Sequence, residues 1–186
     1  MIGYDAKNLA NSFRTVRKNT IQIAEEIPED KYDFRPAEGS MTVAEALKHI
    51  AVSTNWPIRC HSERLTALTF DMFGEVMAHA AAAQAALQTK ADILQALREN
   101  GDRFASFLDG LSNDILAETV SFPAATGQAS KSRFEMLLSA KEHEMHHRAQ
   151  LMVAERMLGI TPHLTRQMNE RVAAFLAQQK QAAHTA

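Results

Sequence analysis

Cysteine is almost absent from this chain, since Cys60 is the only one in 186 residues. A single cysteine excludes an internal disulfide and any CxxC metal or redox motif, which is typical of a reducing compartment. No apolar run approaches the roughly 18 residues of a membrane span, and Asp5 and Lys7 interrupt the place where a signal peptide would need an apolar core. We therefore expect a cytoplasmic protein with no membrane segment.

An excess of charge of one sign is also missing, because 20 Lys and Arg stand against 22 Asp and Glu. Nucleic-acid binding needs a concentrated basic face that releases counterions from phosphate, and no run of residues builds one. The hydrophobic fraction of 46% is instead enough for one sizeable core. We predict a single domain over residues 1–180, a frayed tail over 181–186 and a small-molecule partner, with no nucleic acid.

Apolar residues recur at three- and four-residue steps along much of the chain, which is the periodicity of a buried helical stripe. The pattern predicts four long helices at about residues 4–27, 42–56, 89–111 and 132–158. Capping boxes that begin at Thr42 and Ser132 mark two of the starts, and Gly159 followed by Pro162 ends the last. Four such helices predict an all-α fold, an antiparallel four-helix bundle.

The other segments have weaker patterns. A short extra C-terminal helix is expected at about 165–179, packing through Met168, Val172, Phe175 and Leu176. Residues 58–88 stay undecided, because the alanine-rich run 80–86 favours helix while Gly74 interrupts the pattern. The segment 113–130 is a connection in which the residues from Thr119 to Phe122 could pair briefly as a strand.

Histidines carry the chemical signal. His143 and His147 are one helical turn apart on the stripe that faces the core, where two unpartnered imidazoles would be costly to desolvate. A metal ion would satisfy both rings. His49 lies at the flank of the apolar face of the second predicted helix, and a ligand from one helix meeting a pair on another is an ordinary construction in bundles. Three neutral imidazoles leave one coordination position open, as in catalytic zinc sites.

The alternative interpretation is that these three are core or boundary histidines hydrogen-bonded to nearby backbone. The remaining histidines are assigned to surfaces or helix ends: His61, His79, His146, His163 and His184. His146 points about 100° away from His147, so it is expected to be exposed or to support the site from outside. The ligand set suits one divalent ion, zinc or nickel first, with iron, manganese or copper also compatible.

These motifs together resemble the DinB family, also called the DinB/YfiT-like metalloenzymes. The resemblance rests on the segment from Pro28 to Pro36, on the segment from Val43 to Ala51 that contains His49, on Glu142 to Leu151, and on Leu158 to Pro162. It implies an up-down four-helix bundle, often a homodimer, with a metal on the positions of the three histidines. It also implies either a thiol-dependent S-transferase, with a low-molecular-weight thiol as cofactor, or a hydrolase acting on a small molecule. A non-catalytic metal- or ligand-binding stress-response module is the rival from another class.

Two other metal motifs overlap the same residues. His143 to His147 matches HExxH, the zincin protease signature with Glu144 as general base, but Gln150 and Val153 break the metzincin extension. Glu144 to His147 matches half of a di-iron site, whose second ExxH is missing. We therefore expect Glu144 to lie off the metal axis, either in solvent or in support of the ligands.

No catalytic side chain is identified by the sequence, and the reactive group is expected to be a metal-bound water or thiol. Three residues are candidates for support. Glu45 lies one turn before His49 and could accept its distal N–H, although the capping box competes for it. Arg148 and Gln150 flank the histidine pair and could bind substrate or brace a neighbouring helix. Cys60 is expected to pack in the core and not to bind the metal.

Overall fold

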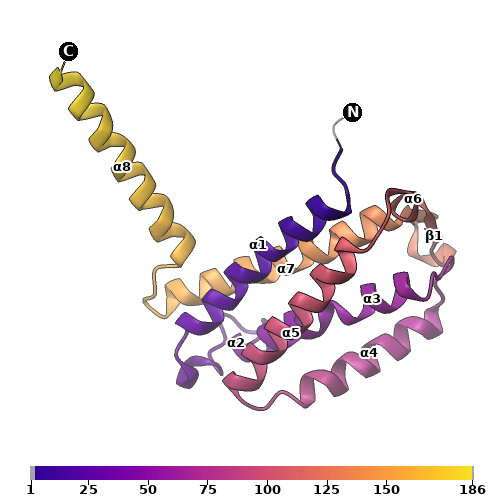
Figure 1. Ribbon diagram of the computed structural model, residues 1–186. Coiled ribbons are helices and arrows are strands. Elements are labelled where there is room, and N and C mark those ends of the chain that lie inside the picture. The colour runs from indigo at the N-terminus through magenta and orange to yellow at the C-terminus, as the bar shows by residue number, and fades with distance from the viewer. Residues whose placement is uncertain (1–2, 186) are drawn as a thin grey trace.

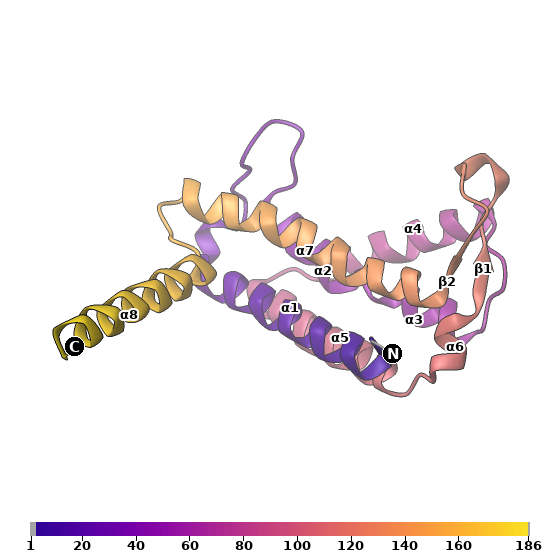
Figure 2. The same cartoon turned by 90° about the horizontal axis from the view of Figure 1, so that it is seen from above.

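Four long helical segments make up the body of the protein. The computed structural model describes residues 3–185, with side-chain surroundings for 3–182. The four segments are α1 (Ala6–Glu26), α2 (Val43–Ser53) continued by α3 (Asn55–Ser62), α5 (Lys90–Asp109) and α7 (Arg133–Met157). α1 and α7 run one way, and α2 and α5 run the other (Figures 1 and 2). α1 and α2 each pack against both α5 and α7. The predicted four-helix bundle is confirmed.

The helix starts follow the local sequence closely. Thr42 and Ser132 form the expected capping boxes with Glu45 and Glu135, and Thr89 forms a third with Asp92. In each, the hydroxyl accepts a hydrogen bond from the backbone N–H three residues on. The acidic side chain of that residue accepts one from the backbone N–H of the capping residue. These caps set where α2, α5 and α7 begin, and therefore which residues of each helix face the core.

The undecided stretch 58–88 becomes α3 and α4 (Phe70–Ala85). Pro57 does not end the helical path, because it falls in the first turn of α3, where its missing N–H is not needed. α4 lies outside the bundle, has no buried residue and returns the chain along α2 (Figure 1). This return is what lets α5 start at the same end as α2 and run in the same direction.

A small cap closes the end of the bundle where α7 begins. It contains α6 (Asn113–Ala117), β1 (Thr119–Ser121), the 3₁₀ turn η2 (Ala124–Thr126) and β2 (Ser130–Ser132), with β1 antiparallel to β2. The brief strand predicted at Thr119 is therefore present. Beneath it, the fully buried Arg133 donates to Glu118, to the Leu65 carbonyl and to Nδ1 of His61. His61 lies in the last turn of α3, so it is at a helix end as expected, but it is buried because this guanidinium holds the ring inside the fold.

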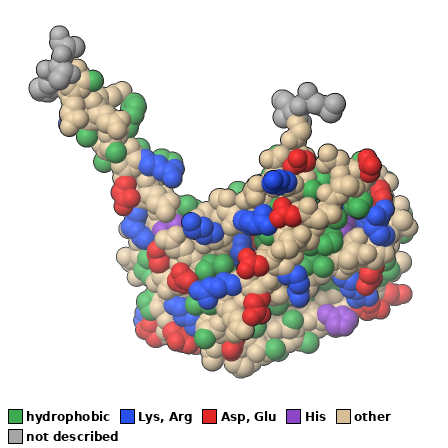
Figure 3. All heavy atoms as spheres, in the orientation of Figure 1, with side chains coloured by type: hydrophobic (Ala, Val, Ile, Leu, Met, Phe, Trp, Pro, Cys, Tyr) green, Lys and Arg blue, Asp and Glu red, His purple; other side chains and the backbone are tan. Residues whose placement is uncertain are grey.

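The C-terminal helix differs from the expectation in length and in surroundings. α8 (His163–Thr185) leaves the body at an angle, and its apolar side chains stand in solvent (Figures 1 and 3). The four expected to pack are about half exposed or more: Met168 58%, Val172 49%, Phe175 58% and Leu176 50%. Periodicity showed the stripe correctly but could not show whether the body offers a surface for it. The helix also runs through residues 181–185, where a frayed tail was expected, and residue 186 lies outside the described part.

The root of α8 is buried, in contrast to the rest of the helix. His163 is 1% exposed, and its Nε2 lies 3.3 Å from the Asn19 side-chain oxygen on α1. His163 is the first residue of α8, so it lies at a helix end as expected, but its ring is buried and not exposed. Pro162, just before α8, is also buried, and its carbonyl accepts from the backbone N–H of Thr165 at 2.9 Å, while α8 contacts α1.

An ion pair lies at the centre of the bundle. Arg17 donates from Nε and Nη2 to the Glu144 carboxylate at 2.9–3.1 Å, and from Nη1 to the Leu97 carbonyl at 2.7 Å. Both side chains are almost fully buried. Gly101 on α5 makes room, because a Cβ there would stand 2.7 Å from Cγ of Arg17. The pair therefore connects α1, α5 and α7 in the middle of the core.

No helix within residues 3–185 combines the length and the apolarity needed to span a membrane.

Candidate metal centre

Three imidazole rings from two helices converge on one point. His49 comes from α2, and His143 and His147 come from successive turns of α7. Nε2 of His143 lies 2.9 Å from Nε2 of His49 and 3.2 Å from Nε2 of His147. All three ligand atoms lie within 4.8 Å of one another, and within the described residues this is the one group of His, Cys, Asp or Glu that could hold a metal ion.

Burial keeps these rings neutral. It lowers the pKa of His143 to about 4, with the neighbouring imidazoles contributing in the same direction. It also lowers the pKa of His49 and of His147 from the ordinary value, although the hydrogen bond to Gln150 raises that of His147 in part. Neutral imidazole is the form that binds a metal. Protons therefore compete little with a metal ion for these nitrogens near neutral pH.

The geometry fits a metal ion. A neutral imidazole has one lone pair, and three Nε2 atoms this close cannot all be satisfied by donating to one another. Tetrahedral coordination at 2.0–2.1 Å per bond would hold two nitrogens about 3.3 Å apart, close to the 2.9 and 3.2 Å seen here. A divalent ion would take up all three lone pairs and leave one position open.

Gln150 fixes the orientation of one ring. Its Oε1 lies 2.9 Å from Nδ1 of His147 and accepts a hydrogen bond from the N–H there, which leaves the Nε2 lone pair facing the other two histidines. Its Nε2 lies 3.2 Å from Nε2 of His146. His146 is exposed, as expected, and its ring also packs edge-to-face on His147, with the centroids 5.0 Å apart. The sequence suggested that Gln150 binds substrate or braces a neighbouring helix. In the structure it instead orients one of the metal-binding histidines.

The other candidates for support lie elsewhere. The Glu45 carboxylate accepts from the Thr42 backbone at 2.7 Å and from Arg35, so its role is the capping box and not a bond to His49. Arg148 is half-buried and faces Glu144 and the root of α8. Cys60 is buried with Leu68 and Val120, as predicted.

Glu144 corrects one part of the expectation. It does lie away from the histidines, but it is fully buried instead of solvent-exposed, and Arg17 occupies both carboxylate oxygens. A carboxylate held in this way cannot act as the general base of an HExxH protease. The periodicity of α1 did contain the missed signal, because Arg17 interrupts an apolar stripe at a core position.

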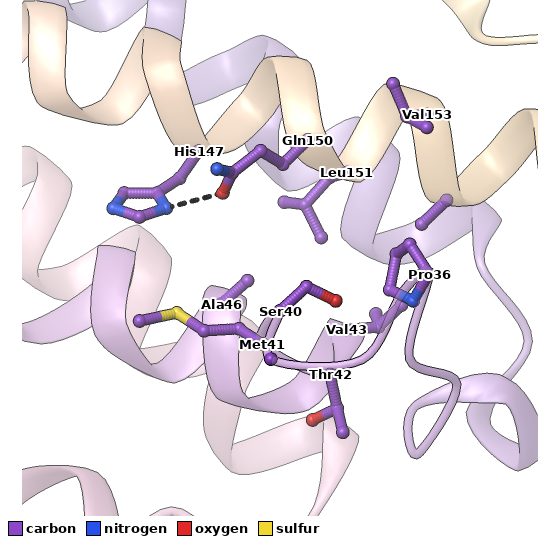
Figure 4. A pocket seen from close by; sticks show the side chains of 12 residues that line it. Pro36, Ser40, Met41, Thr42, Val43, Ala46, His147, Gln150, Leu151 and Val153 are labelled. Carbon is purple, nitrogen blue, oxygen red and sulfur yellow. Dashed lines mark hydrogen bonds between the residues drawn. The ribbon is translucent and has the colours of Figure 1, made fainter.

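A pocket of about 330 Å³ adjoins His147 between α7, the start of α2 and the loop that joins α1 to α2 (Figure 4). The loop contains the short turn η1 (Glu29–Lys31) and reaches the pocket at residues 36–42. Gly39 there has φ of +77°, which favours glycine. The lining is Pro36, Gly39, Ser40, Met41, Thr42, Val43, Ala46, His147, Gln150, Leu151, Val153 and Ala154. No charged side chain is among them.

Comparison with known proteins points to one family and one fold. The family model of the DinB superfamily matches residues 12–151, a range that contains all three histidines. The uncharacterised protein YjoA of Bacillus subtilis is 26% identical over 159 residues, covering 84% of this chain and 92% of that one. Its crystal structure, described as a DinB-like protein, superposes with a TM-score of 0.61 over 83% of this chain and 93% of that chain. YfiT from the same organism, described as a probable metal-dependent hydrolase with an unusual four-helix bundle topology, is 17% identical with a TM-score of 0.67, covering 87% and 92%, and this likeness shows the fold.

Proposed function

This chain belongs to the DinB superfamily, and from that premise we propose that it is a metal-dependent hydrolase of a small molecule, with the metal held by His49, His143 and His147. The observation that carries the proposal is the convergence of three Nε2 atoms from half-buried and buried rings beside a pocket. The description of YfiT as a probable metal-dependent hydrolase supports the reaction class.

The protein's own residues would divide the work simply. The three imidazoles hold the ion, and Gln150 keeps the His147 proton on Nδ1 so that its lone pair stays directed at the site. Of the three ligands only His147 lines the pocket, and the substrate would lie there, beside that ring. A bound divalent ion supplies Lewis acidity and lowers the pKa of water toward neutrality.

Hydrolysis is put before thiol transfer for a reason found in the pocket. A thiol cofactor that carries a carboxylate would find no cationic side chain in the lining of this pocket. The same ligand set could also serve a non-catalytic module that senses a ligand or stabilises the fold. The test must therefore measure binding and turnover separately.

The experiment is elemental analysis of protein purified without an affinity tag, followed by assay against a panel of small esters and amides. We expect about one equivalent of zinc, nickel or a similar ion, and turnover that depends on it. His49→Ala and His147→Ala should each lose most of the metal and the activity, whereas His79→Ala, on the exposed face of α4, should keep both. Equal metal content in all four proteins would disprove the ligand assignment. Bound metal without turnover of any substrate would favour the non-catalytic module.

A further inference from the structure

The pocket beside the histidines has a chemical character of its own, and from it we propose that it binds an uncharged, apolar arm, such as a short alkyl or acyl chain, of the molecule that reacts at the metal centre. This inference rests on the proposed function and narrows its substrate class. Its volume of about 330 Å³ is near the lower end of the 300–1,000 Å³ typical of small-molecule sites, so the arm is short.

The walls of the pocket are apolar on three sides. α7 contributes Leu151, Val153 and Ala154, and α2 contributes Val43 and Ala46. The loop adds Pro36 and Met41, and Met41 lies beside Ala46, across the pocket from α7 (Figure 4). Val153 is 51% exposed, so it forms the open rim and not the buried floor.

The polar side chains in the lining are already hydrogen-bonded within the protein. The Ser40 hydroxyl donates to the Ala37 carbonyl at 2.7 Å, and the Thr42 hydroxyl accepts from the Glu45 backbone in the capping box at 3.1 Å. Gln150 bonds to His147 and to His146. The lining side chains therefore offer few free hydrogen-bonding groups to a ligand. A polar ligand group would find its partner at the metal centre.

This arrangement selects against charge. A carboxylate placed here would lose its water and gain no cation, which is costly, whereas each methylene that is buried gains free energy. The specificity of the pocket would then come from its apolar walls, and Val153 at the rim would be the residue that decides it.

The test uses zinc-loaded protein and measures hydroxamate affinity by calorimetry. Acetohydroxamate reports the open metal position alone, hexanohydroxamate adds an apolar tail, and adipic monohydroxamate has a tail of the same length that ends in a carboxylate. Because one buried methylene is worth about fourfold in affinity, we expect hexanohydroxamate to bind at least about tenfold tighter than acetohydroxamate, and the terminal carboxylate to remove that gain.

Val153→Asp should abolish the gain from the tail and leave acetohydroxamate binding unchanged, while Val172→Asp on α8, similarly exposed at 49%, should change neither. Acetohydroxamate binding with no gain from the tail would overturn the pocket proposal and leave the metal centre standing. If no hydroxamate binds, the open coordination position of the metal is disproved. Saturation-transfer NMR with hexanamide then tests binding in the pocket without the metal. Transfer that Val153→Asp removes would support the proposal, and no transfer to wild type would overturn it.

Discussion

At the scale of single residues, the hydrogen bond from Nδ1 of His147 to Gln150 should matter for the metal affinity of the site. Gln150 accepts a hydrogen bond from this N–H. Loss of the Gln150 amide would let the ring take the other tautomer. We expect Gln150→Leu to weaken zinc affinity by about 10- to 100-fold in a competition titration with a chromophoric chelator. Gln150→Glu, which keeps an acceptor at the same place, should retain most of the affinity. Equal loss in both variants would mean that Gln150 acts by packing alone.

The Arg17–Glu144 pair is a second residue-scale feature, and its two partners should be strongly coupled. Removing one partner leaves a buried charge unpaired, so Arg17→Met or Glu144→Leu alone should lower the free energy of unfolding by about 3–5 kcal/mol. The double variant should cost much less than the two single losses together. Urea unfolding of the four proteins gives the coupling energy, and additive losses would contradict it.

Glu155, at the root of α8, should make stability depend on pH. Its carboxylate is fully buried, neither oxygen has a hydrogen-bond partner among the described residues, and burial raises its pKa to about 7, with Glu26 adding to the effect. A carboxyl whose pKa is raised on folding stabilises the fold at low pH, and that contribution is lost as pH rises from about 4.5 to about 7.

We therefore expect Glu155→Gln to be more stable than wild type at pH 8, by about 3 kcal/mol or less, and similar to it at pH 5. Urea unfolding at both pH values measures this difference, with Glu142→Gln on the exposed face of α7 as the control. A gap between Glu155→Gln and wild type that is the same at both pH values would show that the carboxyl does not titrate in this range.

At the scale of elements, α8 is the helix that contributes least to the body. From Gln167 to Ala182 every residue is exposed, whereas His163 is buried and Arg166 pairs with Glu26 at 2.7 Å. Truncation after Arg166 should therefore change the free energy of unfolding of the body by less than about 1 kcal/mol, measured in dilute solution. A loss of several kcal/mol would mean that the distal part of α8 packs against something in solution.

The same scale explains what local sequence could predict. The starts of α2, α5 and α7 depend on a hydroxyl and an acid three residues apart, so the chain itself specifies them. α4 was not predicted as one helix, because its surroundings are mostly solvent and its alanines and Gly74 give little periodicity. The packing expected of α8 was wrong for the related reason that a stripe does not identify its own partner.

At the scale of the whole molecule, the assembly is still a prediction. The homodimer implied by the family resemblance should sediment at about twice the chain mass of 20.6 kDa, and a monomer at all concentrations would disprove it.

The sequence by itself determined the four long helices, their caps and the core-facing positions of His143 and His147, because these follow from spacing along one helix. Only the tertiary structure decided that His49 lies 2.9 Å from His143, that Arg17 and not solvent meets Glu144, and that the walls beside His147 are apolar. Each of these depends on how separate helices pack, and packing is a property of surfaces brought together, which the pattern within any one segment does not contain.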